Sequence, residues 1–323
     1  MLSLVACQKS NPPPVQVEEK QEEPAELDLT KLCNNLSKEM QDIDNTRTTF
    51  ALEQINQNLK ICIPLADFKH QMDLLHLSNQ MYDNFLIVKR TPKEQNAFDF
   101  YALDMAQYPT IQQSHQEEFS LRDQYLLKHE GQAYIELHET AQHELIYRRN
   151  PQYLARLFAP YLPQAERIFI ENLAQQNMQN IFHNNRLTID AHEILDRALF
   201  WESYVDQYHK SHFIKEAQHL KQVYTQLLFK GMPEDPVSTS YFGEVSIKSD
   251  HLSAIQTIAK LNNSQLAYQA RRFLNFIQIN QVERKRITHT DYSSSQLNEY
   301  LKLKPVQINQ NINCFADAIC HEH

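Results

Sequence analysis

The sequence predicts a mainly α-helical protein, built as a multi-helix bundle or an irregular helical array, with a small β-hairpin near residues 133–147. Two observations predict this class. The chain contains 3 glycines in 323 residues, although average usage is about 7% and turn-rich β folds consume glycine. Apolar side chains also recur at intervals of three and four residues along most of the chain, which is the spacing of one helix face.

Three helices are predicted at the start of the folded part of the chain. Asp28 or Thr30 can cap the first helix. The second helix stops before Pro64 and the third ends near Pro92, because proline does not continue a helix. The apolar positions that predict them are, in order, Leu29, Leu32, Leu36, Met40 and Ile43, then Phe50, Ile55 and Leu59, then Phe68, Met72, Leu75, Met81, Phe85 and Leu86.

Seven further helices follow from the same pattern. Pro151 can occupy the first position of one of them, Asp190 can cap the longest, and Gly231 can end that longest helix. The segment 231–248 is rich in proline, serine and glycine, which predicts a loop and a candidate subdomain boundary. Residues 288–323 are polar and irregular. The expected helices cover about 93–107, 111–129, 151–161, 164–184, 188–229, 250–262 and 264–285.

One segment departs from helical spacing. After Gly131, residues 133–137 and 144–147 form two short runs of aromatic and branched side chains around a polar centre. Such runs are typical of strands, and their separation favours a β-hairpin.

Composition excludes several functional classes. The net charge is −9 and the sequence pI is about 5.9, so no nucleic-acid partner is expected, because phosphate binding requires a basic patch. The 3 glycines are too far apart for a P-loop, a dinucleotide-binding fingerprint or a nucleophile elbow. The sequence therefore favours a protein that is not an enzyme.

The N-terminus carries a short motif. Leu4, Val5, Ala6 and Cys7 fit the successive positions of a lipobox, and the segment therefore resembles bacterial lipoproteins. The resemblance implies a lipidated Cys7, with the membrane as a partner through its acyl chains. Gln8 in place of Asp after the cysteine implies the outer membrane, with the protein facing the periplasm.

The lipobox suggests how the chain divides into regions. Residues 1–7 are expected to be the remnant of a lipoprotein signal peptide, and residues 8–27 a disordered tether rich in proline and glutamate. Residues 28–310 form the helical domain, and residues 311–323 a C-terminal tail that contains Cys and His.

Four cysteines remain after Cys7, an even number that suggests two disulfides in an oxidising compartment. Cys33 and Cys62 end two consecutive helical patterns, so an antiparallel helix pair is expected to join them. On one continuous helix, Cys314 and Cys320 would lie about 9 Å apart, beyond disulfide reach. Either their segment is not helical or these two cysteines bond elsewhere.

A histidine-rich stripe is the main candidate metal site. His209, His212, Glu216 and His219 fall within roughly an 80° arc if the predicted helix 188–229 is continuous. Neighbours at this spacing can ligate zinc or copper together with a ligand from another element. The alternative is a solvated flank of an amphipathic helix, with no cofactor.

Two further clusters contain metal-ligand residue types. Residues 138–143 read H-E-T-A-Q-H and resemble the H-E-x-x-x-H helix of the dipeptidyl-peptidase III class of zinc peptidases, but they lack that class's glycine before the second histidine. If residues 133–147 form a hairpin, this match spans a turn and carries no chemistry. The tail sequence Cys320-His321-Glu322-His323 can bind soft metals adventitiously.

These observations predict a membrane-anchored envelope lipoprotein that works as a non-catalytic interaction or assembly protein, with an envelope protein as its partner. A periplasmic metal-binding protein that uses the histidine stripe is the alternative. An envelope hydrolase is a second alternative.

Overall fold

The computed structural model describes residues 29–107, 113–140, 144–183, 186–306 and 312–322. These residues are mainly helical, as the sequence predicts, and contain thirteen α-helices. None of the helices described is long and apolar enough to cross a membrane.

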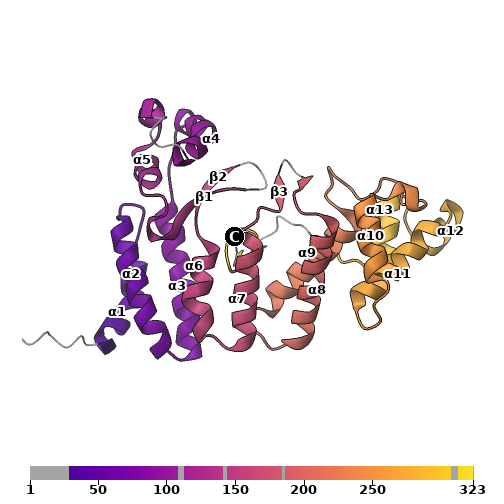
Figure 1. The fold of residues 1–323 in the computed structure, drawn as a ribbon, viewed down its shortest axis with the longest axis horizontal. Helices are drawn as coiled ribbons and strands as arrows, with labels where there is room; N and C mark the ends of the chain where they lie inside the picture. The colour runs from indigo at the N-terminus through magenta and orange to yellow at the C-terminus, as the bar shows by residue number, and fades with distance from the viewer. Residues whose placement is uncertain (1–28, 108–112, 141–143, 184–185, 307–311, 323) are drawn as a thin grey trace, which may run out of the picture.

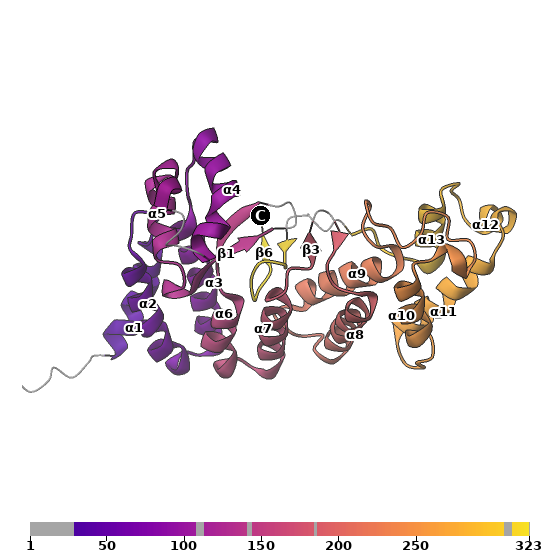
Figure 2. The ribbon, with the colours of Figure 1, turned by 45° about the horizontal axis from the view of Figure 1, so that its top comes forward.

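Most helices stand side by side in an elongated row (Figure 1). Helices α4 (Pro92–Gln107) and α5 (Leu121–Lys128) rise above one end of the row, and the C-terminal helices form the other end (Figure 2). In chain order the row consists of α1 (Leu29–Gln41), α2 (Thr49–Cys62), α3 (Phe68–Leu86), α6 (Pro151–Phe158), α7 (Gln164–Asn177), α8 (Ala191–Gln207), α9 (Ile214–Lys230), α10 (Ser249–Ile258), α11 (Gln265–Gln278), α12 (Gln281–Ile287) and α13 (Ser293–Leu301).

Three antiparallel hairpins lie along one edge of this row, and we call this side the hairpin edge (Figures 1 and 2). The longest pairs β1 (Ile135–Glu139) with β2 (Leu145–Arg149), which confirms the predicted hairpin. The other two are short. They pair β3 (Phe182–His183) with β4 (Arg186–Leu187), and β5 (Ile312–Asn313) with β6 (His321–Glu322).

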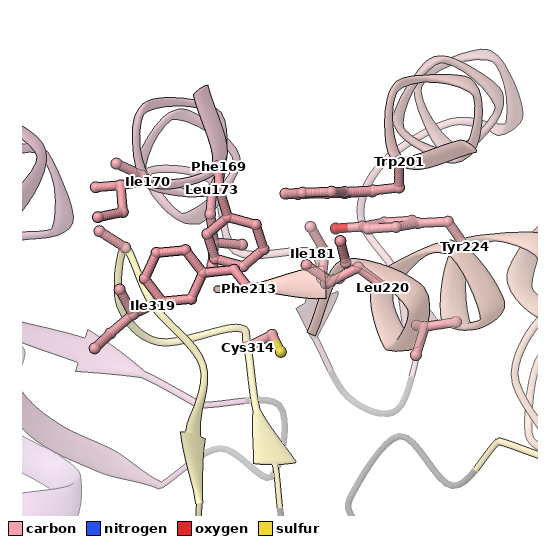
Figure 3. Packing of buried hydrophobic residues seen from close by; sticks show 14 of the residues in the cluster. Phe169, Ile170, Leu173, Ile181, Trp201, Phe213, Leu220, Tyr224, Cys314 and Ile319 are labelled. Atoms are coloured by element: carbon pink, nitrogen blue, oxygen red, sulfur yellow. The ribbon is translucent and has the colours of Figure 1, made fainter. Parts of the chain in front are cut away.

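The C-terminal hairpin packs into the middle of the core. Cys314 and Ala318 are fully buried there, and Cys314 and Ile319 belong to the same hydrophobic cluster as Phe169 and Leu173 of α7 (Figure 3). Burial of such large apolar side chains stabilises a fold by about 1.5–3 kcal/mol each. The C-terminal hairpin therefore contributes to the core through Cys314, Ala318 and Ile319.

Several predicted helix limits agree with the structure. Pro151 occupies the first turn of α6, Asp190 caps α8 by accepting a hydrogen bond from the backbone of Glu193, and Gly231 ends α9 with φ of 71°. Thr30 lies inside α1 and is not its N-cap. Asp28 lies outside the described residues.

The predicted single helix 188–229 is wrong, because it breaks between Gln207 and Ile214. Glu166 of α7 causes the break. Its buried carboxylate accepts hydrogen bonds from the backbone N–H of His212 (2.9 Å) and from Ser211 Oγ (3.1 Å). This tertiary contact pairs with polar groups of the turn. It cannot be predicted from the spacing of apolar residues along the chain.

Other predicted helices are also shorter or divided; among them, the 250–262 helix ends at Ile258. The 164–184 helix ends at Asn177, and the 264–285 helix divides at Asn280, which caps α12. In the 111–129 segment, Ser120 caps α5 after a separate 3₁₀-helix, Gln113–Glu118. The segment after 288 also contains helix α13, which its polar composition concealed.

The four described cysteines form two pairs at disulfide distance. Cys33 and Cys62, at adjacent helices α1 and α2, have Cα atoms 5.5 Å apart. Cys314 and Cys320 have Cα atoms 4.0 Å apart, because their segment is a hairpin and not a helix. In the chain-entropy model, a loop of about 30 residues closed by the first pair stabilises by roughly 3–4 kcal/mol.

Lys302 offers a direct test of the backbone geometry. It ends α13 in the left-handed region, with φ of 56° and ψ of 41°. Glycine adopts this conformation without the steric cost of a Cβ, so Lys302→Gly is expected to raise the free energy of unfolding by about 1 kcal/mol. Denaturant unfolding measures this change. Lys304→Gly is the control, since Lys304 is exposed and lacks positive φ, and an equal gain there would contradict the assignment.

Candidate functional site

The hairpin edge holds a cavity of about 490 Å³ beside β2, which we call the β2 cavity. Its volume lies within the range of about 300–1,000 Å³ that is typical of ligand sites. All five residues of β2 line it. The remaining lining residues come from α3, from the chain that follows α3 and from the C-terminal hairpin: Asn79, Tyr82, Asp83, Leu86, Ile87, Val88, Arg90, Asn313, Ala316, Asp317 and His321.

Arg149 connects the parts of the β2 cavity wall that come from β2, α3 and the C-terminal hairpin. Its guanidinium donates hydrogen bonds to Ser78 Oγ (3.0 Å), to Asn79 Oδ1 and to Asp317 Oδ2 (2.9 Å). It also lies 4.7 Å from the ring centroid of Tyr82. Arg149 is 3% exposed, so these acceptors replace water around a buried charge.

A second buried ion pair supports the middle of β2, at Tyr147. Asp123 is fully buried and accepts two hydrogen bonds from Arg90, at 2.9 and 2.7 Å. It also accepts hydrogen bonds from Ser120 Oγ (2.7 Å) and Tyr147 Oη (3.1 Å). Burial and the nearby carboxylate raise the pKa of Tyr147 far above its usual value, so this phenol stays a neutral donor.

Arg148 connects β2 to its partner strand β1 and to the C-terminal hairpin. Its side chain donates to Glu136 on β1 (2.7 Å) and to the carbonyl of Ala316 (3.1 Å). Burial, together with the charge of Arg148, lowers the pKa of His138 to about 3. His138 is therefore a neutral imidazole at physiological pH.

Asp317 and His321 form a carboxylate–imidazole pair in the wall of the β2 cavity, with His321 Nε2 3.2 Å from Asp317 Oδ2. Burial favours the neutral acid, but Arg149 and the hydrogen bond from His321 outweigh it and hold the pKa of Asp317 well below its usual range. Burial likewise disfavours the imidazolium, but Asp317 outweighs it and raises the pKa of His321.

The outer edge of β2 has main-chain groups that face away from β1. Thr140 N donates to Glu144 O, and Asn150 N donates to Tyr134 O, at the two ends of the ladder. The antiparallel alternation then directs the N–H and C=O groups of Leu145, Tyr147 and Arg149 outward. Within the described part of the chain this sheet has two strands, so no third strand pairs with that edge. The arrangement can accept an added strand.

The predicted histidine stripe does not lie on one helix. His209 and His212 are exposed residues of the turn that separates α8 from α9, whereas Glu216 and His219 lie on α9. His219 Nε2 and Glu216 Oε2 are buried without a hydrogen-bond partner among the described residues, and burial lowers the pKa of His219. No group of three or more His, Cys, Asp or Glu side chains in the described ranges gathers closely enough to hold a metal ion.

The H-E-x-x-x-H match spans the β-hairpin. His138 and Glu139 lie on β1, and His143 lies outside the described residues. Because His138 and Glu139 lie on a strand, they do not have the helical geometry of the dipeptidyl-peptidase III class, and the motif gives the envelope-hydrolase alternative no support.

Sequence reasoning missed the residues that line the β2 cavity. Arg149 ends a short strand and Asp317 lies in a polar tail, so neither belongs to a periodic pattern or a spaced motif. One available signal was the position of Asp317 between Cys314 and Cys320, because a bridged tail is ordered. Comparison of the chain with protein-family models, with curated proteins and with solved structures finds no match.

The pair of Asp317 and His321 predicts a pH dependence. The raised folded-state pKa of His321 means that its stabilising charge is fully present below its ordinary pKa of about 6.5 and is lost as pH rises through the folded value. We expect His321→Gln to lower the free energy of unfolding more at pH 5.5 than at pH 8.5. Denaturant titrations at both pH values measure this. The control, His76→Gln at an exposed helical position, is expected to show no such difference, and equal losses for His321→Gln at both pH values would contradict the assignment.

Arg90→Met tests the second ion pair. It leaves the buried Asp123 carboxylate without its main partner, and loss of one member of a buried pair costs about 3–5 kcal/mol. The expected result is a loss of about 3 kcal/mol in the free energy of unfolding. Arg286→Met is the control, because the side chain of Arg286 is 76% exposed in its pair with Glu283, and a change within about 0.5 kcal/mol is expected there. Similar losses in both variants would refute a special role for Asp123.

Proposed function

We propose that the protein is a lipid-anchored interaction protein of the cell envelope, which binds an extended polypeptide segment along β2. The free outer edge of β2, beside a cavity that all five of its residues line, carries this proposal. An extended peptide that adds a strand to a sheet edge gains main-chain hydrogen bonds, and pockets for alternate side chains supply specificity.

The walls of the β2 cavity suit such a segment. Leu86, Ile87 and Val88 offer apolar contacts opposite the strand. Ile87 is 49% exposed and thus available at the rim. The arginines of the site are already held by carboxylates, so the outward groups of β2 are positioned before a partner arrives, which reduces the ordering cost of binding.

The N-terminal residues and the cysteines support the proposed location in the cell envelope. Cys7, in its lipobox context, would carry the acyl chains, and the segment 8–27 would span the distance to the helical domain from the periplasmic face of the outer membrane. Two cysteine pairs at disulfide distance support an oxidising compartment.

Strand addition makes a prediction that side-chain docking does not. Peptides selected for binding to the purified protein are resynthesised with a single N-methyl group at each position in turn. We expect affinity to fall roughly tenfold at every second residue, where an inward N–H is lost, with small effects between. Isothermal titration measures the affinities. A flat N-methylation profile would refute strand addition.

A matched pair of variants locates the peptide. Ile87→Arg places a bulky charge at the rim of the β2 cavity, whereas Leu261→Arg makes the same change at a residue outside the cavity lining with nearly the same exposure, 48% against 49%. The first variant should abolish peptide binding and the second should leave it intact. Equal binding by both would place the peptide elsewhere.

Cys7→Ser tests the anchor. The variant cannot accept a diacylglyceryl group, so we expect the protein, expressed from its native start, to move from the membrane fraction to the aqueous fraction. Fractionation and globomycin-sensitive processing measure this. Cys320→Ser is the matched control and should remain in the membrane fraction, while an aqueous native protein without globomycin-sensitive processing would contradict the proposal.

A further inference from the structure

A second pocket lies between α2 and α6, away from the lining of the β2 cavity. Its volume is about 380 Å³, and we call it the tyrosine pocket. Three tyrosines, two basic residues and one leucine line it: Lys60, Tyr134, Tyr153, Arg156, Leu157 and Tyr161.

Tyr153 gives the first indication of a ligand. Its side chain belongs to a residue that is 4% exposed, yet its hydroxyl is buried without a hydrogen-bond partner among the described residues. Buried hydroxyls in native proteins are nearly always paired, so an unpaired one calls for an explanation. Burial raises the pKa of Tyr153, which keeps the phenol neutral and able to donate.

The backbone beside it gives a second indication. Ala133 and Tyr134 have φ of 48° and 62°, in the left-handed region that such residues rarely adopt. Their neighbours hold them there: Glu53 accepts from Ala133 N (3.2 Å), Tyr82 donates to Ala133 O (2.7 Å), and Asn150 donates to Tyr134 O (2.8 Å). Backbone conformations maintained in this way cluster at ligand sites.

This conformation fixes an aromatic wall. The ring of Tyr134 stacks on the ring of Tyr153, with centroids 3.3 Å apart and an interplanar angle of 8°. Tyr134 and Tyr161 are 37% and 45% exposed. The tyrosine pocket therefore presents apolar ring surface together with phenolic hydroxyls, a combination that suits ligands with both apolar faces and polar groups.

The charge of the lining is positive. Lys60 and Arg156 are both exposed, and no carboxylate is among the lining residues. The described side-chain hydrogen bond of Arg156 goes to a neutral group, the carbonyl of Gln152 (3.2 Å). A carboxylate on a ligand would meet two cations here, and arginine is well suited to bind it through paired hydrogen bonds.

We infer that the tyrosine pocket binds an acidic sugar. The sugar's carboxylate would lie by Lys60 and Arg156, its C–H face would pack on the exposed tyrosine rings, and one of its hydroxyls would accept the hydrogen bond of Tyr153. A neutral sugar lacks the first of these interactions, and an aromatic carboxylate lacks the last.

Three probes separate these contributions. Isothermal titration of the whole protein with glucuronate, glucose and benzoate should show saturable binding of glucuronate that is at least about tenfold tighter than binding of either other compound. Absence of saturable glucuronate binding would overturn the proposal. Equal affinity for glucose would exclude recognition of the charge, and equal affinity for benzoate would exclude the sugar.

Single substitutions then test which side chains of the tyrosine pocket bind the sugar. Arg156→Gln should weaken glucuronate binding about tenfold or more, and Tyr153→Phe about threefold to tenfold. Arg167→Gln is the control, since Arg167 is an exposed arginine of α7 outside the pocket lining, and it should bind as the native protein does. Unchanged binding by Arg156→Gln or Tyr153→Phe would overturn the assignment.

A measurement without ligand tests the premise independently. Because the hydroxyl of Tyr153 has no internal partner, Tyr153→Phe should melt at the same temperature as the native protein or higher. A clearly lower melting temperature would show that the hydroxyl is satisfied within the protein, and would remove the reason for expecting a ligand there.

Discussion

The contact between Arg149 and Asp317 is the constraint on which the hairpin edge depends. It joins residues 168 positions apart in the sequence, at a place where both side chains are nearly removed from solvent. A buried ion pair adds little stability over an apolar pair of the same shape, but loss of one partner is costly. Its main consequence is therefore positional: in the observed arrangement of α3, β2 and the C-terminal hairpin, both terminal nitrogens of the guanidinium are hydrogen-bonded.

Other contacts extend this arrangement into the helical row. Asn177, at the end of α7, donates to the carbonyls of Cys314 (2.9 Å) and Asp317, so the C-terminal hairpin is held from the helix side as well. Tyr82 lies under the guanidinium of Arg149 and donates to the carbonyl of Ala133 (2.7 Å). The same network thus reaches the β2 cavity on one side and the backbone that shapes the tyrosine pocket on the other.

The sequence predicted the helices and strands whose formation depends on residues close together in the chain. Apolar periodicity placed most helices, Pro151, Asp190 and Gly231 marked ends that the structure retains, and the change to short aromatic runs located the β1–β2 hairpin. Proximity of Cys33 to Cys62 followed from two consecutive helices. Each of these inferences uses residues close together in the chain.

Features that depend on distant residues were not predictable. Glu166 breaks the long helix that apolar spacing implies, and this break removes His209 and His212 from the helix that carries Glu216. Helix α13 buries Leu297 and Leu301 within a polar segment, which leaves little pattern to detect. The β2 cavity forms only where a strand, a helix and the C-terminal hairpin meet. No residue spacing in the sequence predicts that these three segments lie together.

A double-mutant cycle between Arg149 and Asp317 measures how strongly these two side chains interact. The free energy of unfolding is measured for the native protein, for Arg149→Met, for Asp317→Leu and for the double variant. We expect a coupling energy of about 2 kcal/mol, because each single change leaves a buried charge unpaired and the double change does not. Additivity within about 0.3 kcal/mol would show that the two side chains do not interact, and would contradict the role given to the C-terminal hairpin.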